Sequence, residues 1–310
     1  MALLREPLLA AARSPRLRSV AEKSRLTRPV VDRFVAGGAE ADALRVTAEL
    51  AEANLYVTLD FLGEDTISVA QAQQTVRAYE SALKALAAAG NADRAEVSVK
   101  LSAIGQSLPG DGERIALDGA RQICAVAAGV GTTVTIDMED HTTTDSTLGI
   151  VGQLRADFPW VGAVLQAYLK RTEGDCRELA TAGSRIRLCK GAYAEPESVA
   201  FSGEAVEDSY RRCLGVLFGG RGYPMVASHD PTMIAAARSQ IVQNSRTPDS
   251  YEFQMLYGIR PDEQRALAAA GHRMRIYVPY GDEWYGYFMR RLAERPANLA
   301  FFLRSLTSKK

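Results

Sequence analysis

The amino-acid sequence predicts an α/β fold, a closed (β/α)8 TIM-type barrel with extra N-terminal helices. After residue 50, eight short runs rich in β-forming residues alternate with longer alanine-rich stretches of helical pattern. No linker-like break divides the eight repeats, which favours closure into one barrel. The first strand–helix junction, LDFLGEDTIS, has no GxGxxG, so the dinucleotide fingerprint of an open doubly wound sheet is missing.

Residues 1–50 predict a helical segment that packs on the barrel. They are rich in Ala, Leu, Arg and Glu, and Ser14-Pro15 and Gly37-Gly38 interrupt them. The barrel itself is expected over residues 51–310. A chain of 310 residues is long enough for a single core of this kind.

The strands of the barrel are short and bounded by polar or glycine-containing segments. The helical patterns between them are clearest at Ser68–Ala89 and Gly112–Ala128. In chain order, we expect the strands at Leu55–Leu59, Glu96–Leu101, Thr132–Ile136, Gly162–Gln166, Arg185–Cys189, Pro224–Ala227, Tyr251–Met255 and Met274–Val278.

Charge and cysteine usage argue against several classes of protein. The 37 Lys and Arg residues balance the 37 Asp and Glu residues, whereas a nucleic-acid-binding protein would carry a basic excess. A net charge near zero favours association, so a homo-oligomer is compatible with the sequence. Cys124, Cys176, Cys189 and Cys213 form no CxxC pair or zinc motif, and we expect reduced thiols of a cytoplasmic protein. We recognise no signal peptide and no stretch apolar enough to span a bilayer.

Polar side chains follow nearly every predicted strand. In a (β/α)8 barrel the carboxyl ends of the strands meet at one mouth, where active sites are built. A purely structural protein would not need to collect such groups there, so the sequence predicts an enzyme. The groups are Asp60 and Glu64, Lys100 and Ser102, Asp137 to His141, Gln166 and Tyr168, Arg187 and Lys190, Ser228 to Asp230, Gln254 and Tyr257, and Tyr277, Tyr280 and Asp282.

Several of these groups also have a structural interpretation. Lys100 is expected to point into the barrel, where a buried lysine is costly unless it is paired. The run from Asp137 to His141 is either a metal site or, taken alone, a solvated acidic loop. Arg185 and Arg187 share a strand face, and such a pair is usually solvated. His229 could cap the next helix.

The segment after the fifth strand combines positive charge with glycine. Arg187 and Lys190 precede Gly191-Ala192-Tyr193. Glycine lets the backbone approach a ligand closely, and the cations suit a phosphate or the negative charge of a reduced flavin.

After the eighth strand, a helix that begins near Asp282 carries two adjacent arginines. Trp284, Tyr287 and Arg291 share one face, and Arg290 borders it. This helix is either a packed amphipathic helix with solvated arginines or a platform on which the arginine pair grips a carboxylate.

Together these segments resemble the catalytic domain of the proline dehydrogenase family, in its monofunctional bacterial form. The resemblance runs from about Leu55 to Asn298, and its departures, such as Cys189 for valine and Ser228 for threonine, remove no titratable or hydrogen-bonding group. At 310 residues we expect no room for the aldehyde dehydrogenase domain of bifunctional members. The family's motifs occur in order as VSVKLSA (97–103), DMEDH (137–141), LQAYL (165–169), IRLCKGAYAEP (186–196), ASHD (227–230), EFQMLYGI (252–259) and YVPYGDEWYGYFMRRLAERPAN (277–298).

The resemblance implies a substrate site for L-proline. Asp137 and Arg187 are implied as its catalytic residues. Because adjacent arginines leave a helix about 100° apart, we expect Arg291 to lie deep and Arg290 nearer the rim, where Glu64 would pair with it as a gate over bound proline. The residues implied to bind the substrate are Lys100, Arg290 and Arg291 at the carboxylate, and Leu256, Tyr277 and Tyr287 around the ring.

The resemblance also implies FAD as the cofactor, held without a covalent bond because no cysteine or histidine stands where the family pattern would attach it. Arg187 is expected near the reactive nitrogen of the flavin. No metal is implied. The implied cofactor contacts are Met138, Gln166, Arg187, Lys190, Gly191, Ala192, Tyr193, Ser228 and His229.

The implied reaction is the oxidation of L-proline to Δ1-pyrroline-5-carboxylate, the first step of proline catabolism. A hydride would pass to N5 of FAD and the electrons to a membrane quinone, so the family implies a cytoplasmic protein with peripheral contact at the inner face of the membrane. Two other classes stay open: a Schiff-base aldolase with Lys190 or Lys100 as nucleophile, and a non-catalytic proline or flavin sensor. A bound yellow chromophore would count against the aldolase, and proline:dye oxidoreductase activity against the sensor.

Overall fold

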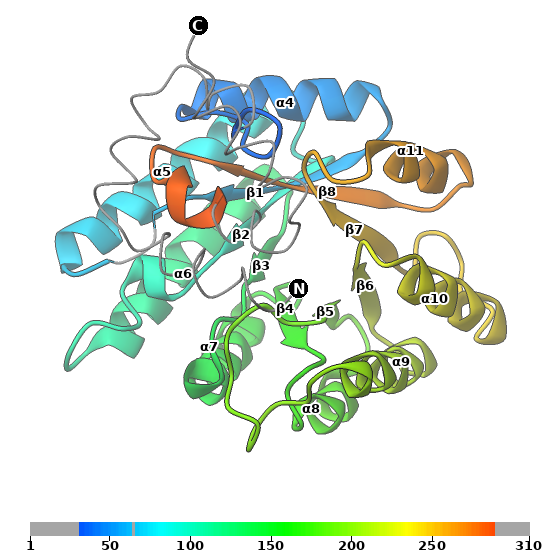
Figure 1. The fold of residues 1–310 in the computed structure, drawn as a ribbon. Coiled ribbons are helices and arrows are strands. Elements are labelled where there is room, and N and C mark those ends of the chain that lie inside the picture. Colours follow the sequence, from blue (N-terminus) through cyan, green and yellow to red (C-terminus); the bar gives the residue numbers. More distant parts are fainter. Residues whose placement is uncertain (1–30, 64–65, 289–310) are drawn as a thin grey trace, which may run out of the picture.

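A computed structural model describes residues 31–63 and 66–288 of the chain. Eight parallel strands form a closed barrel in chain order, and the last strand pairs with the first (Figure 1). The predicted (β/α)8 barrel is therefore confirmed.

The observed strands lie within two residues of the predicted ones at every end. The main difference is at the second strand, which ends before Lys100, so this side chain leaves the backbone just beyond the sheet. The strands are β1 Tyr56–Phe61, β2 Ala95–Val99, β3 Val134–Ile136, β4 Gly162–Gln166, β5 Arg185–Cys189, β6 Tyr223–Ala227, β7 Glu252–Leu256 and β8 Met274–Tyr280.

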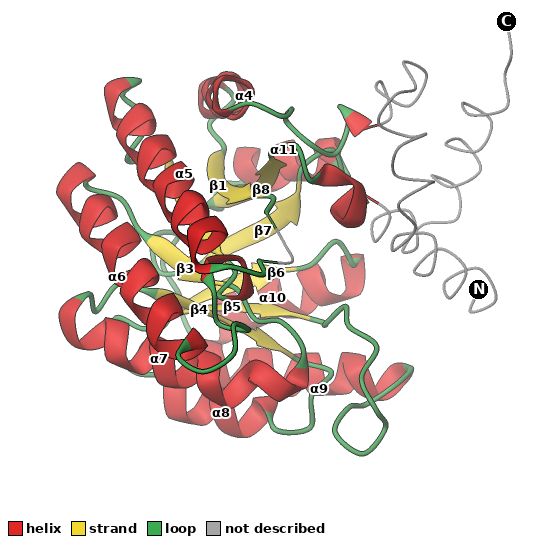
Figure 2. Ribbon diagram, turned by 90° about the vertical axis from the view of Figure 1, so that its left-hand side faces the viewer, coloured by secondary structure: helices red, strands yellow, loops and turns green. Residues whose placement is uncertain are grey.

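Helices cover the outside of the barrel (Figure 2). Their apolar faces pack on the strands, as in α5, whose buried side chains include Val76, Tyr79 and Leu83. The crossover helices are α5 Val69–Ala88, α6 Gly112–Val130, α7 Thr144–Asp157, α8 Thr172–Leu179, α9 Glu204–Gly219, α10 Pro231–Gln243 and α11 Pro261–Ala269, with short 3-10 turns η2 Ser102–Ile104 and η3 His141–Thr143. None of the helices within the described ranges is long and apolar enough to cross a membrane.

Local sequence signals begin the helices. The Ser68 hydroxyl accepts a hydrogen bond from the Gln71 N–H at 3.3 Å and so caps α5. Asp230 caps α10 through the Thr232 N–H at 2.8 Å, and Pro231 takes the first helical position, where it loses no helical hydrogen bond. The cap of α10 is therefore Asp230 and not His229.

Helix α4, Glu40–Glu52, precedes the first strand and packs against β1, β8 and α5 (Figure 1). Two backbone hydrogen bonds of 2.9 Å, from the Ala36 N–H to Pro279 O and from the Gly281 N–H to Gly37 O, join the segment before α4 to the end of β8. The predicted N-terminal segment, residues 1–50, includes most of α4. Its first 30 residues lie outside the described part of the chain, so its boundary stays a prediction.

The strands alternate between two faces, and the inner face is polar. Val57, Leu59 and Val97 alternate with Thr58 and Glu96, and the polar pair is joined by a hydrogen bond of 2.9 Å. The apolar residues therefore face the helices, while polar groups fill the interior of the barrel. This arrangement places chemically active side chains along the axis that leads to the mouth.

Candidate active site

Four of the predicted site residues meet near the mouth of the barrel. Asp137 follows β3, and its Oδ1 atom accepts a hydrogen bond of 2.7 Å from Arg187 Nη1. Its Oδ2 atom accepts another, also of 2.7 Å, from the Tyr277 hydroxyl. Lys100 Nζ lies 3.5 Å from that hydroxyl oxygen and 3.9 Å from Asp137 Oδ2. Closure of the barrel thus brings together residues contributed by β2, β3, β5 and β8.

The Arg187 guanidinium is buried and held from several sides. Besides Asp137, its Nη1 atom donates to the Ser98 hydroxyl at 2.9 Å, and its Nε atom donates to Gln254 Oε1 at 2.6 Å. Its carbon atom Cζ lies 5.3 Å from the centre of the Tyr277 ring, a cation–π distance. Arg187 is therefore fixed in one orientation. The interpretation of Arg187 as a solvated strand charge and of Asp137 as part of a solvated loop is wrong, because they are only 4% and 9% exposed.

The Tyr277 hydroxyl is protonated and acts as a donor. Burial raises the pKa of Tyr277 well above its ordinary value, and the nearby carboxylates of Asp137 and Asp60 raise it further. The tyrosine therefore presents a neutral, hydrogen-bonded hydroxyl to the site across the physiological pH range.

Lys100 points into the barrel, as its place in the strand pattern predicts, and it is paired. Its Nζ atom donates to Asp60 Oδ1 at 2.8 Å and to Oδ2 at 2.7 Å. Asp60 is fully buried. The sequence showed Asp60 at a strand end without a role, although its alternation with Thr58 on β1 could have placed it inside the barrel.

The ends of β3 and β4 are joined by a predicted cofactor-binding residue. Gln166 Nε2 donates to the backbone carbonyl of Glu139 at 2.6 Å. The Glu139 carboxylate in turn accepts bonds from the Ser102 hydroxyl at 2.7 Å and from the Ser102 N–H at 3.2 Å. The acidic segment after β3 is thus tied to its neighbours.

Lys190, after β5, forms two ion pairs with carboxylates of the protein. Its Nζ atom lies 2.7 Å from Asp230 and 3.2 Å from Glu207. The hydrogen bond from Lys190 holds the pKa of Asp230 below its ordinary value, so both groups stay charged. Ser228 Oγ accepts the Asp230 N–H at 3.1 Å. The predicted cofactor residues Lys190 and Ser228 therefore share Asp230 as a partner.

His229 links β6 to β7. Its Nε2 atom accepts a hydrogen bond of 2.9 Å from the backbone N–H of Leu256, and its backbone carbonyl accepts one of 2.6 Å from Arg260. Because Nε2 is an acceptor, a neutral His229 carries its proton on Nδ1. The structure thus joins a predicted cofactor residue to Leu256, a predicted substrate residue.

The backbone at Gly191 needs a residue without a side chain. Its φ is +112°, a conformation that L residues rarely adopt, and a Cβ atom would come within 2.2 Å of Tyr168 Cδ1. The ring of Tyr168 is in turn held by a hydrogen bond of 3.1 Å from its hydroxyl to Glu195. This part of the loop after β5 can therefore run close against the end of β4.

The other predicted site residues fall into two groups. Met138, Ala192 and Tyr193 lie in the loops after β3 and β5, where Met138 is buried and Tyr193 is partly exposed. Tyr287 is buried in a helical stretch whose described residues run from Trp284 to 288, so this helix begins two residues after Asp282. Glu64, Arg290 and Arg291 lie outside the described residues, and their pairing and roles stay predictions.

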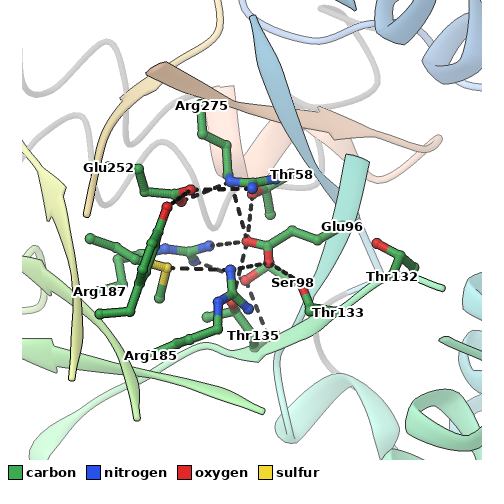
Figure 3. Close-up of polar contacts among 12 residues, drawn as sticks. Thr58, Glu96, Ser98, Thr132, Thr133, Thr135, Arg185, Arg187, Glu252 and Arg275 are labelled. Carbon is green, nitrogen blue, oxygen red and sulfur yellow. Dashed lines mark hydrogen bonds and ion pairs between the residues drawn. The ribbon is translucent and has the colours of Figure 1, made fainter. Parts of the chain in front are cut away.

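Beneath Arg187 lies a layer of charges that sequence reasoning missed. The strand pattern favours a solvated Arg185, but the Arg185 side chain is only 12% exposed and its Nη2 atom lies 2.7 Å from a Glu96 oxygen. We call the four residues Glu96, Arg185, Glu252 and Arg275 the buried charge layer (Figure 3). The signal was in the sequence, because each of them stands two residues before a polar residue on the same strand face.

The charge layer should make the stability of the protein depend on pH. Burial opposes ionisation of Glu96, but Arg185, Arg275 and Arg187 outweigh it and hold the pKa of Glu96 below its ordinary 4.5. A carboxylate with a lowered folded pKa stabilises the fold above its unfolded pKa, and the contribution is lost as the pH falls through the folded value. Glu96→Gln should therefore be less stable than the unchanged protein at pH 7. The difference in free energy of unfolding between the two proteins should become smaller as the pH falls below 4.5.

Urea unfolding of both proteins at neutral pH and at several acidic values measures this gap. Glu113→Gln removes an exposed glutamate at the start of α6 and should stay within about 0.5 kcal/mol of the unchanged protein. A Glu96→Gln gap that keeps its size down to the most acidic pH would contradict the assignment of a lowered pKa.

Within residues 31–63 and 66–288, no group of three or more His, Cys, Asp or Glu side chains could hold a metal ion. The carboxylates near the mouth are paired with cations instead, as Asp60 is with Lys100 and Asp137 with Arg187. The groups that the described residues offer near the mouth include buried cations, a tyrosine hydroxyl and an aspartate.

The chain matches known proteins along most of its length. Residues 43–304 match the sequence profile described as proline dehydrogenase. Proline dehydrogenase 1 of Bacillus subtilis (strain 168) is 39% identical over 284 residues, which cover 91% of this chain and 92% of the relative. Proline dehydrogenase of Deinococcus radiodurans is 38% identical over 309 residues, which cover 98% of both chains.

The fold is similar to that of a solved structure. The crystal structure of proline utilization A (PutA) from Bdellovibrio bacteriovorus inactivated by N-propargylglycine has a TM-score of 0.78 and 24% sequence identity. The match covers 86% of this chain and 32% of the other, so this chain spans about a third of that protein's length. Because the family profile covers most of the chain and the two relatives are similar along almost their whole length, the chain belongs to the proline dehydrogenase family.

Proposed function

We propose that this chain is an FAD-dependent proline dehydrogenase that oxidises L-proline to Δ1-pyrroline-5-carboxylate and passes the electrons to a membrane quinone. The observation that carries the proposal is the constellation of Lys100, Asp137, Arg187 and Tyr277, which lies near the mouth of the barrel in a member of this family. A buried, rigidly held cation in such a place suits a ligand that gains negative charge.

The residues around the mouth fit a flavin cofactor. Gly191 lets the loop after β5 run without a side chain where a Cβ atom would collide with Tyr168, and a bare backbone can come close to a large planar ligand. Lys190, one-third exposed at its side chain, and the Ser228 hydroxyl offer a cation and a donor suited to phosphate oxygens. Arg187 supplies the charge that would favour the reduced state of the flavin.

Lys100 would bind the substrate carboxylate while Asp60 holds the ammonium group in place. Both Asp60 oxygens accept from Lys100 Nζ, so this lysine is already aimed before proline arrives. Positioning of this kind can supply a large part of a rate enhancement. We assign Arg290 and Arg291 to the same carboxylate by their match to the family motif, with Glu64 as a candidate gate.

Asp137 and Tyr277 would shape the rest of the site. Asp137 fixes the orientation of Arg187, and the Tyr277 ring stacks beneath that guanidinium and so closes one side of the pocket for proline. A bound flavin would supply the two-electron oxidation, in which a hydride leaves the ring carbon that adjoins the proline nitrogen and does not carry the carboxylate. The amine must be unprotonated for this transfer, since its lone pair assists the departure of the hydride.

A visible absorption spectrum of the purified protein before and after addition of L-proline tests the proposal. We expect flavin bands that bleach under anaerobic conditions when L-proline is added and return when a quinone analogue is supplied. Acid denaturation should release the flavin from the polypeptide, because the proposed binding is non-covalent. Protein without flavin that is instead trapped by borohydride with a carbonyl substrate would support a Schiff-base aldolase.

Gly191→Ala should reduce the amount of flavin that stays bound. The added methyl group meets Tyr168, and the positive φ alone costs roughly 1–3 kcal/mol for a residue with a side chain. We expect a clear loss of flavin per chain after gel filtration, with an unchanged circular dichroism spectrum. Gly174→Ala is the matched control, because nothing lies within 4 Å of a Cβ atom there. Full flavin occupancy in Gly191→Ala would remove this loop from the cofactor site.

A further inference from the structure

The buried charge layer, Glu96, Arg185, Glu252 and Arg275, has no part in the reaction proposed above. Glu96 and Glu252 are 1% and 0% exposed and Arg275 is 7% exposed. Buried charges cost free energy unless they are paired, and apolar residues of similar volume often serve stability equally well. Together with Arg187 and Asp137 of the site, the layer makes a cluster of three arginines and three carboxylates.

Glu96 is the centre of the layer (Figure 3). Its carboxylate accepts hydrogen bonds from the hydroxyls of Thr58 at 2.9 Å and Thr133 at 2.7 Å, and from Arg185 Nη2 at 2.7 Å. Arg275 Nε lies 3.8 Å away. These contacts come from β1, from the residue before β3, from β5 and from β8, so Glu96 is fixed in position from around the barrel.

Glu96 also contacts Arg187, an arginine of the candidate site. Its Oε1 atom lies 3.6 Å from Nη2 of Arg187. Within the described residues, that nitrogen is buried and has no hydrogen-bond partner, whereas Nη1 and Nε are bonded to Asp137 and Gln254. Glu96 is therefore the charge that Arg187 meets on the side away from Asp137.

From this geometry we propose that Glu96 is a positioning residue that, through Arg187, sets the reduction potential of the flavin bound at the mouth. The inference rests on the proposed function, because it requires a flavin above Arg187. Charges in a poorly solvated interior are weakly screened. The net charge of Glu96 and Arg185 therefore acts on Arg187 and on a flavin bound above it. The negative charge of Glu96 partly offsets the attraction of Arg187 for a reduced flavin. It also holds the Arg187 guanidinium toward the buried charge layer and away from the mouth of the barrel.

Removing a negative charge and removing a positive charge from the layer should shift the reduction potential of the flavin in opposite directions. In Glu96→Gln the negative charge is lost, so the site becomes more positive and Arg187 is freed toward the mouth. The reduced flavin is then favoured and the potential rises. In Arg185→Gln the positive partner of Glu96 is lost, so Glu96 acts more strongly on Arg187 and the potential falls. If the two residues were merely structural, both variants would lose stability, and the reduction potential of the flavin would not shift in opposite directions.

The experiment is an anaerobic spectroscopic titration of the flavin-loaded proteins against redox dyes of known potential. We expect shifts of about 30 mV, upward for Glu96→Gln and downward for Arg185→Gln, which correspond to tenfold in the equilibrium constant of a two-electron couple. The double variant Glu96→Gln/Arg185→Gln restores the charge balance and should return close to the unchanged potential. It also keeps the test open if Glu96→Gln alone does not fold.

Arg185→Lys is the matched control, because it keeps the charge that the proposal invokes while it changes the hydrogen bonds. The reduction potential of the flavin in Arg185→Lys should stay near that in the unchanged protein. Shifts of the same sign in Glu96→Gln and Arg185→Gln, or a double variant displaced as far as a single one, would overturn the inference. An unchanged protein that binds no flavin would instead refute the proposed function, so the two failures are distinguishable.

Discussion

Arg187→Met should lower kcat/KM for L-proline by at least about 100-fold, the scale of loss seen when one preorganised donor is removed from an active site. The structure gives the reason, because the guanidinium is held by Asp137, Ser98 and Gln254 before any ligand arrives. Methionine fills a similar volume but supplies neither charge nor donors. The effect should fall mainly on kcat, since Arg187 is proposed to favour the reduced state of the flavin rather than to bind proline.

Two further variants separate this role from a contribution to stability. Arg187→Lys keeps the charge but cannot bond Asp137 and Gln254 in a fixed fork, so it should recover only part of the activity. Arg246→Met removes an arginine that donates to four backbone carbonyls away from the site, and it should cost stability while kcat/KM stays within a few-fold. Steady-state kinetics with a dye acceptor and thermal unfolding measure both quantities. An Arg187→Met enzyme within tenfold of the unchanged one would remove Arg187 from catalysis.

The barrel could be predicted because its strands carry local signals. Gly162–Gln166 and Arg185–Cys189 were located to the residue, since each is a short β-forming run between helical or glycine-containing segments. The strand ends that differ from the prediction lie where the local sequence pattern is weak. The second strand ends at Val99 and not Leu101, because the chain turns into a 3-10 helix at Ser102.

The buried charge layer was missed for a different reason. Strand alternation tells which residues share a face, but the solvation of that face depends on closure of the sheet. A charge pair such as Arg185 and Arg187 on one strand face is usually solvated on an open sheet, but here both side chains face the interior of a closed barrel. Glu96 is 89 residues from Arg185 in the sequence, so no local sequence pattern predicts their contact.

The sequence named several residues that the structure brings together, but it did not show which side chains they would contact. Family motifs pointed to Lys100, Asp137, Arg187 and Tyr277, and the structure brings these together. The motifs did not show that both carboxylate oxygens of Asp60 accept hydrogen bonds from Lys100. Such pairings depend on distances across the barrel, which the order of motifs along the chain does not contain.

Lys100→Met should weaken both the fold and the capture of proline. The change removes the lysine partner of Asp60, a fully buried carboxylate, and breaking such a buried pair costs about 3–5 kcal/mol of stability. It also removes a cation proposed to bind the substrate carboxylate, for which we expect a loss of about 2–5 kcal/mol in kcat/KM. The kinetic loss should appear mainly in KM, in contrast to Arg187→Met.

Asp60→Asn/Lys100→Met distinguishes the two losses. Replacing both members of a buried ion pair leaves no isolated charge, so the double variant should recover much of the stability lost in Lys100→Met. Its affinity for proline should not recover, because the ammonium group is still absent. Urea unfolding and steady-state kinetics of Lys100→Met, Asp60→Asn and the double variant give the complete cycle. If KM recovers together with stability, Lys100 serves only to neutralise Asp60, and the carboxylate of proline must be bound without it.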